Sequence, residues 1–328
     1  AFFGGGWDRE ENDWTGTHIY GVDIATGAIV YKHSIGVAVP GSFAAHDSDL
    51  DGFHDRIYFG DSDGSVWRIE FPAPNDPAAT GVGAANLERI FDFRAGFAAR
   101  QQFFTRPIIV PAKFDGANFI WALAMGAGDR ANLQLEDGGI NAFYFMLDSG
   151  TYATPRTAGD LVGIDYTSLT GDIQCADTAL DPVNGLYGWY MTMRPNEKTT
   201  FEATVINGHV LFPTFEPGLD LLATDPPDLC GGAGGGGGGG GGGFGGPEPP
   251  DVDPDFVCRA AGIGRVYDLW FECGNGTQTE LNDLPTGSEF YTIDGTTYVT
   301  HTLSGGSPGL TQEFLNPSGY TVTNWRQE

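Results

Sequence analysis

Basic side chains are scarce in this sequence of 328 residues, which has 16 Lys and Arg against 43 Asp and Glu and a net charge of −27. Such a surface repels nucleic-acid phosphates and anionic lipids, which argues against nucleic-acid binding and direct membrane-surface binding. No apolar run approaches the roughly 18 residues of a membrane-spanning helix, so membrane insertion is not expected. The excess of acid fits a soluble protein that works outside the cytoplasm and attracts divalent cations.

Cysteine is rare as well, and its spacing excludes a zinc knuckle. The four cysteines Cys175, Cys230, Cys258 and Cys273 contain no C-x-x-C pair. An even number of cysteines permits two disulfides in an oxidising compartment, with three connectivities possible. We favour Cys230 with Cys258, because this bridge closes the base of a glycine-rich stretch; four buried free thiols are the alternative.

The sequence also lacks helical periodicity, and short β-rich runs separated by Gly, Asn and Asp recur from end to end. Turn glycines at positive φ and the type I′ dipeptides Asn207-Gly208 and Asp294-Gly295 predict hairpins. The four clearest hairpins join residues 17–24 to 28–32, 57–59 to 66–71, 201–206 to 209–212, and 290–293 to 296–299. Phe119–Met125 and Phe143–Leu147 are apolar enough to be buried strands.

Repeated hairpins every 40 to 50 residues or so, without helices to cover a sheet, are typical of a β-propeller. The alternative is a β-sandwich, which holds only about seven to nine strands. We therefore predict an all-β, modified β-propeller that forms one domain over residues 1–328. Residues 231–250 are rich in Gly and Pro and are expected to form a flexible insertion within it.

The most informative segment is the acidic string at residues 47–55, with the pattern D-x-D-x-D-G-x-x-D. Carboxylates at alternate positions around a turn glycine can wrap one hard cation, and Ca²⁺ takes roughly 6–8 oxygen ligands at about 2.3–2.6 Å. A solvated Asp-rich turn is the alternative. The predicted Ca²⁺ ligands are the side chains of Asp47, Asp49, Asp51 and Asp55 and the backbone carbonyl of Phe53.

This loop departs from an EF-hand in a way that locates it in the fold. An EF-hand places a bidentate Glu at position 12 of its loop and flanks the loop with helices. Position 12 here is Tyr58, inside a predicted strand at residues 56–60. We therefore expect Asp55 to close an EF-hand-like calcium loop inserted directly before a blade hairpin.

Other motifs in the sequence are weaker evidence of function than the acidic string. Residues 60–64 and 305–309 match G-x-S-x-G, but neither is followed by a helix, so a catalytic serine is not expected. The histidines form no H-E-x-x-H zinc site. His46 and His54 adjoin the acidic loop, where solvent contact or a hydrogen bond to a ligand is their expected role.

The segment from His46 to Phe71 closely resembles the calcium loop and following hairpin of the PilY1 family of type IV pilus proteins. The resemblance covers most of residues 1–230. Supporting pieces in similar order are Phe3-Gly4-Gly5-Gly6, Tyr20-Gly21-Val22-Asp23, Ala25-Thr26-Gly27, Gly188-Trp189-Tyr190, Asn207-Gly208-His209-Val210-Leu211-Phe212 and Cys230-Gly231-Gly232.

The resemblance implies an exported, non-enzymatic propeller at the pilus tip or cell surface that supports pilus assembly and attachment. It also implies that one bound Ca²⁺ regulates pilus extension against retraction. Minor pilins are the implied partners, through an exposed strand edge or the propeller rim, and surfaces or host receptors are attachment targets. The chain begins without a signal peptide and resembles a processed C-terminal portion of a longer protein.

Two other classes of function stay open at this point. One is a propeller enzyme, either quinoprotein dehydrogenase-like or glycan-active, in which calcium is structural. The other is a lectin-like binding module, which needs tryptophans exposed at the rim. A quinone absorbance, a cleft with close carboxylates, or saturable sugar binding would distinguish them.

Overall fold

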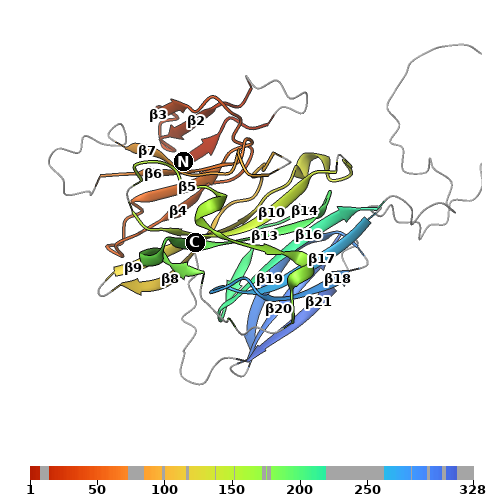
Figure 1. The fold of residues 1–328 in the computed structure, drawn as a ribbon. Coiled ribbons are helices and arrows are strands. Elements are labelled where there is room, and N and C mark those ends of the chain that lie inside the picture. The colour runs from red at the N-terminus through yellow and green to blue at the C-terminus, as the bar shows by residue number, and fades with distance from the viewer. Residues whose placement is uncertain are drawn as a thin grey trace, which may run out of the picture.

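The computed structural model is built from β-strands with a few short 3-10 turns between them (Figure 1). The residues described are 1–7, 15–72, 85–97, 100–115, 118–136, 138–150, 152–171, 175, 179–218, 262–281, 283–293, 296–304 and 308–315. Within these ranges, no helix is long and apolar enough to cross a membrane. The glycine-rich residues 231–250, and with them the predicted insertion, lie outside the described residues.

The described strands form five sheets that follow one another along the chain. The first sheet has the order β1-β2-β3, and the second has the order β4-β5-β6-β7. Their strands are β1 (Phe2–Gly4), β2 (His18–Val22), β3 (Ile29–Ser34), β4 (Ala44–His46), β5 (Arg56–Gly60), β6 (Ser65–Glu70) and β7 (Asn86–Asp92).

The third sheet is the largest and has the order β11-β13-β10-β9-β8, with β12 also paired to β13. Its strands are β8 (Ile108–Asp115), β9 (Asn118–Gly126), β10 (Ile140–Asp148), β11 (Val162–Asp165), β12 (Leu180–Asp181) and β13 (Leu186–Pro195). The 3-10 turns between them are η2 (Arg130–Asn132), η3 (Ala158–Asp160), η4 (Tyr166–Ser168) and η5 (Pro182–Asn184). The pairing of β11 with β13 is parallel, whereas the other pairings between the strands described are antiparallel.

The fourth sheet has the order β14-β16-β17-β18, with β15 also paired to β16, and the fifth has the order β19-β20-β21. Their strands are β14 (Lys198–Thr199), β15 (Thr204–Ile206), β16 (His209–Pro217), β17 (Gly262–Trp270), β18 (Gly276–Leu281), β19 (Pro285–Ile293), β20 (Thr296–Leu303) and β21 (Pro308–Leu315).

The four predicted hairpins are confirmed as the antiparallel pairs β2–β3, β5–β6, β15–β16 and β19–β20. Gly27 and Gly64 have φ of 73° and 94° in their turns, the left-handed region that a glycine enters without strain. Asn207 and Gly208 have φ of 49° and 86°, as a type I′ turn requires. The predicted buried strands lie in β9 and β10, and every residue of β10 after Ile140 is buried.

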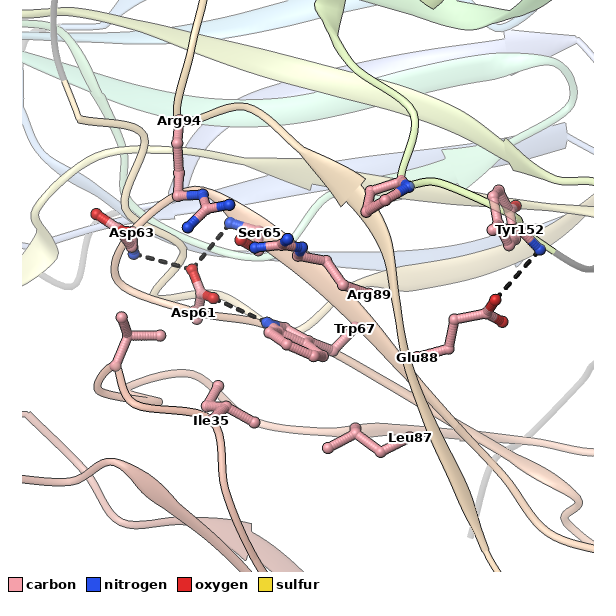
Figure 2. A pocket seen from close by; sticks show the side chains of 12 residues that line it. Ile35, Asp61, Asp63, Ser65, Trp67, Leu87, Glu88, Arg89, Arg94 and Tyr152 are labelled. Atoms are coloured by element: carbon pink, nitrogen blue, oxygen red, sulfur yellow. Dashed lines mark hydrogen bonds between the residues drawn. The ribbon is translucent and has the colours of Figure 1, made fainter.

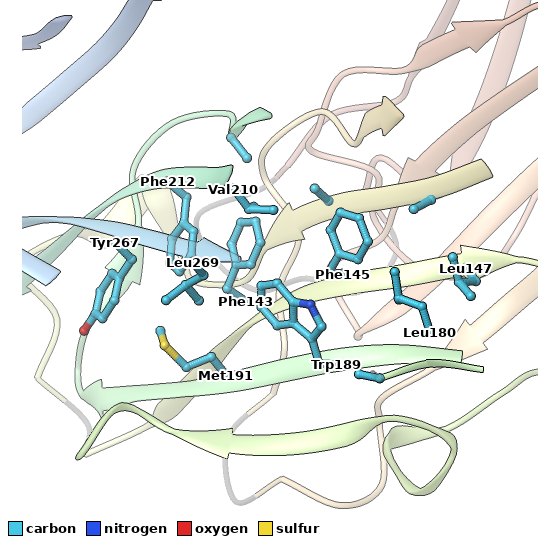
Figure 3. Packing of buried hydrophobic residues seen from close by; sticks show 14 of the residues in the cluster. Phe143, Phe145, Leu147, Leu180, Trp189, Met191, Val210, Phe212, Tyr267 and Leu269 are labelled. Carbon is cyan, nitrogen blue, oxygen red and sulfur yellow. The ribbon is translucent and has the colours of Figure 1, made fainter. Parts of the chain in front are cut away.

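Each hydrophobic core lies between two successive sheets, which is how a propeller buries the faces of its blades. One core joins the first and second sheets through Ile19, Val39 and Phe59, and the next joins the second and third through Tyr58, Phe91 and Tyr144. A third lies between the third and fourth sheets (Figure 3), where Phe143 stacks on Phe212 with ring centroids 3.7 Å apart. A smaller core joins the fourth sheet to Val299 of the fifth. The all-β, propeller-like fold predicted from the sequence is therefore confirmed.

A disulfide between Cys175 and Cys273 connects the third sheet to the fourth, with Cα atoms 5.8 Å apart. The alternative of four free thiols is therefore wrong. Cys230 and Cys258, which we expected to pair, lie outside the described residues, so their pairing stays a prediction. A disulfide of this kind is typical of a protein from an oxidising compartment.

Candidate metal centre

The acidic loop connects β4 to β5, so it is the tip of a hairpin in the second sheet. The pairing of His46 with Arg56 closes the base of the loop, and the backbone N–H of Asp55 donates to the carbonyl of His46 at 3.0 Å. The predicted strand at residues 56–60 is confirmed as β5, so Tyr58 belongs to the sheet. Strand β4 was not predicted, because its three residues carry no strand or turn signal of their own.

Within the loop, backbone N–H groups fold back onto carboxylates. Asp47 accepts from the N–H groups of Gly52 at 2.7 Å and Asp51 at 3.1 Å, and Asp51 accepts from the N–H of Phe53 at 2.8 Å. Leu50 and Gly52 both have positive φ, 62° and 96°. A leucine in this region costs of the order of 1 kcal/mol and persists only where surrounding structure enforces it, a pattern that concentrates at binding sites.

The loop brings Asp47, Asp49 and Asp51 together, with one oxygen from each within 4.8 Å of the others. Two ligands on opposite sides of one Ca²⁺ are about 4.6–5.2 Å apart, given Ca–O distances of about 2.3–2.6 Å. The three carboxylates therefore fit around a single ion of this size. They are half-buried or exposed, so the position is open to solvent and to further ligands.

Asp47 stays ionised readily because the loop donates to it. Its slight burial by itself raises its pKa, but backbone N–H groups of Gly52, Asp51 and Leu50 outweigh this effect and hold the pKa below its ordinary value. Three carboxylates this close repel one another when no cation lies between them. The arrangement is thus a preformed anionic cradle.

Asp55, another predicted ligand, does not belong to this group of three. The carboxylate of Asp55 accepts from the backbone N–H of Ser48 at 2.7 Å and from its hydroxyl at 2.5 Å, which ties the two ends of the loop together. The backbone N–H of Phe53 points into the loop, and its side chain is 62% exposed. Coordination by Asp55 and by the Phe53 carbonyl remains a prediction.

The third sheet holds the loop in place. The Trp121 indole N–H donates to the carbonyl of Ser48 at 3.1 Å, and the Trp121 ring packs edge-on against His46 at 3.9 Å between centroids. Burial lowers the pKa of His46 to about 4, so this imidazole is neutral at pH 7. The loop therefore lies where the second and third sheets meet, and its order is linked to their packing.

The motif at residues 60–64 is a tight turn between two strands. Asp61 accepts from the N–H groups of Asp63 and Ser65 at 2.9 and 2.8 Å and from the indole of Trp67 at 2.8 Å. Strand β6 follows at once, so the helix that a nucleophile elbow needs is missing from this place.

Sequence reasoning missed a buried ionic network between the second and third sheets. Asp148 of β10 accepts from Arg68 at 2.9 Å and from the Tyr58 hydroxyl at 2.6 Å, and Arg68 also bonds Glu88 at 2.8 Å. The partners lie 80 and 90 residues apart, so no local pattern could have revealed them.

No protein-family model matches the chain, and no curated protein does. Two solved structures are similar only weakly. A subtype N10 neuraminidase-like protein of A/little yellow-shouldered bat/Guatemala has a TM-score of 0.27 and 9% identity, over 83% of this chain and 62% of its own. The WD40 domain of SCAP from fission yeast has a TM-score of 0.29 and 8% identity, over 93% of this chain and 73% of its own. The Pseudomonas aeruginosa PilY1 C-terminal domain is similar over 90% of this chain and 66% of its own length, with a TM-score of 0.60 and 16% identity. At this identity the likeness shows the fold, and the chain has the all-β, propeller-like fold of the PilY1 C-terminal domain.

Proposed function

We propose that this chain is a calcium-binding, non-catalytic protein of type IV pili, located at the pilus tip or cell surface. In this role it supports pilus assembly, calcium-regulated extension and retraction, and surface adhesion, with minor pilins as partners. The observation that carries the proposal is the convergence of Asp47, Asp49 and Asp51 on a hairpin loop of a PilY1-like fold.

Calcium binding is supported by the chemistry of the donors. Carboxylate oxygens at alternate positions are the ligands that Ca²⁺ prefers, and the cradle is held open by backbone hydrogen bonds and by the contact between Trp121 and Ser48. In the proposal, Asp55 and the Phe53 carbonyl complete the ligand set after a small rearrangement of the loop. Neutralising the three carboxylates then orders the hairpin tip beside the third sheet.

The pilus role is supported by the fold together with the loop sequence. The fold alone is compatible with many functions, because propellers host unrelated activities. The acidic loop directly before the β5–β6 hairpin is the feature that favours a pilus protein over these other functions. The disulfide supports export, because such bonds persist in oxidising compartments.

Thermal unfolding with calcium and with a chelator tests the site. We expect calcium at 100 times its Kd to stabilise the native chain by about 2.7 kcal/mol, because only the folded loop assembles the cradle. Asp49→Asn and Asp51→Asn keep the side-chain shape and remove one charge each, so both should lose most of this shift. Asp23→Asn is the matched control, because Asp23 caps an exposed turn in the first sheet with two backbone hydrogen bonds.

Equal calcium shifts in the native chain and in both loop variants would exclude this site. The same variants, expressed in the producing bacterium in place of the native chain, test the pilus role separately. We expect cells without the chain to lose surface pili, and cells with Asp49→Asn to keep pili whose extension no longer responds to calcium. Normal piliation of cells that lack the chain would exclude the proposed role in pili, but it would not contradict the proposed calcium binding.

A further inference from the structure

A cavity of about 420 Å³ lies beside the β5–β6 turn of the second sheet (Figure 2). The acidic loop precedes β5, at the opposite end of this strand from the turn. Its walls come from β6 and β7, from the segment after β3, and from the segment after β10. The volume is within the range of small-molecule sites, which is about 300–1,000 Å³. The proposed pilus function does not use this cavity.

The acidic groups of the cavity are occupied by donors of the protein itself. Asp61 takes the three hydrogen bonds of its turn, and Asp63 pairs with Arg100 at 2.9 Å. Glu88 accepts from Arg68 at 2.8 Å and from the N–H of Tyr152 at 3.2 Å. These carboxylates therefore have internal partners and are poor candidates for binding a cation.

The two arginines of the cavity, Arg89 and Arg94, differ in how many of their N–H donors have a partner. Arg94 is held by Asp92 through two hydrogen bonds of 2.9 and 2.6 Å. The Nε of Arg89 is buried and has no hydrogen-bond partner, and its Nη1 lies 3.5 Å from Asp92. A guanidinium has five N–H donors, and a buried donor without a protein partner needs an explanation, such as a bound water, ion or ligand.

The surroundings of Arg89 define what such a ligand looks like. Figure 2 shows Arg89 extending over Trp67, with its guanidinium carbon 5.7 Å from the ring centroid. Ile35 and Leu87 line the side of the cavity below Trp67 in this view. A guanidinium with an unpaired Nε donor thus adjoins an apolar and aromatic wall.

We propose that this cavity binds a small organic carboxylate that carries an apolar or aromatic group. Arg89 holds the carboxylate, for which its planar fork is suited, and Trp67, Ile35 and Leu87 receive the apolar part. A singly charged carboxylate fits better than a doubly charged phosphate, because Asp61 and Glu88 repel the carboxylate less strongly. A free acid and the C-terminal carboxylate of a peptide share this chemistry.

Calorimetric titration of the full chain with 3-phenylpropionate and with acetyl-Gly-Gly-Phe tests the proposal and distinguishes the two sources. We expect a Kd of about 1 mM for at least one of them, as usual for ligands of this size. The matching amides, 3-phenylpropionamide and acetyl-Gly-Gly-Phe amide, should bind at least about tenfold more weakly, because they lack the charge that Arg89 recognises. The result should be the same in calcium and in chelator.

Arg89→Gln should weaken carboxylate binding to the level of the amide. Arg106→Gln is the control, because Arg106 is paired with Glu202 away from the cavity. It should leave the affinity unchanged. No binding of either carboxylate, or equal binding of carboxylate and amide to the native chain, overturns the proposal whether or not Arg89→Gln folds. Unchanged affinity in a folded Arg89→Gln also overturns it.

Discussion

Asp148 is the residue through which the second and third sheets are connected electrostatically. Its carboxylate is buried and accepts hydrogen bonds from Arg68, Tyr58 and Tyr152. Burial by itself raises the pKa of Asp148, but the charge of Arg68 and the hydrogen bonds from Tyr58 and Arg68 outweigh it, so the pKa lies below the ordinary value of 3.8. The ionised form is therefore the one that the fold stabilises.

The pH dependence of stability follows from the sign of this shift. A carboxylate whose pKa is lower in the folded state stabilises the protein fully above its unfolded pKa. For Asp148 this contribution is present above about pH 4 and is lost as the pH falls through the lower folded value.

Replacement of Asp148 by Asn tests this account. The variant removes the most buried of the charge partners of Arg68, which keeps Glu88 at 2.8 Å and Glu70 at 3.3 Å, so we expect a loss of about 1–3 kcal/mol at pH 7 and a flatter decline in stability below pH 4. Urea unfolding at pH 7 and at pH 3 measures both effects. Asp165→Asn serves as the control, because Asp165 caps an exposed 3-10 turn, and it should change stability by about 0.5 kcal/mol or less. A parallel decline in native and Asp148→Asn proteins would contradict the assignment.

The acidic triad could be predicted from the sequence, whereas this network could not. Asp47, Asp49 and Asp51 lie within five positions, so their spacing already determines that they meet in a turn. Asp148 and its partners meet only because two sheets pack, and packing is decided by cores whose residues come from distant segments. For the same reason, the cavity around Arg89 had no local signature.

At the scale of elements, turn chemistry explains which hairpins could be predicted. The hairpin turns at Asn207-Gly208 and at Gly64 need left-handed backbone, which glycine and asparagine adopt at lower cost than other residues. Such residues therefore identify the turn in the sequence. Short strands with ordinary flanks, such as β4 and β14, gave no comparable signal. Their pairing depends on neighbours in the sheet that local sequence does not specify.

The β15–β16 turn gives a test of this explanation. Gly208 has positive φ, and a Cβ there would approach the Trp270 ring to 2.5 Å, whereas Gly27 has positive φ with open space around it. Gly27→Ala should therefore cost only the strain of the backbone, about 1 kcal/mol, and Gly208→Ala should cost about 1–3 kcal/mol more. Equilibrium unfolding in urea compares them. Equal losses would show that Trp270 moves away freely.

At the scale of the whole molecule, the sheets pack in the order in which they occur in the chain. Among the described residues, each core joins neighbouring sheets, as in the sequence-based expectation of repeated blade units. The Cys175–Cys273 bond adds a covalent link between the third and fourth sheets. The hairpin repeats predicted this general architecture, but they could not give the pairing of cysteines 98 positions apart.

Peptide mapping under non-reducing conditions tests the pairing. We expect a peptide pair linking Cys175 to Cys273 and a second linking Cys230 to Cys258. The double variant with serine at Cys175 and Cys273 should lose about 2–5 kcal/mol, because a bridge across nearly 100 residues strongly restricts the unfolded chain. Serine at Cys230 and Cys258 provides the matched comparison. A peptide linking Cys230 to Cys175 would contradict the connectivity.

The pairing of Pro217 with Gly262 at the ends of β16 and β17 has a consequence for what this chain tolerates. The entropy lost on closing a loop grows only with the logarithm of its length, so a connection about ten times longer than a tight turn costs only about 2 kcal/mol more. The register of these two strands is determined by their side chains and not by the length between them. A change in the number of residues that connect β16 to β17 should therefore alter the free energy of folding only slightly, because the pairing of the two strands stays the same.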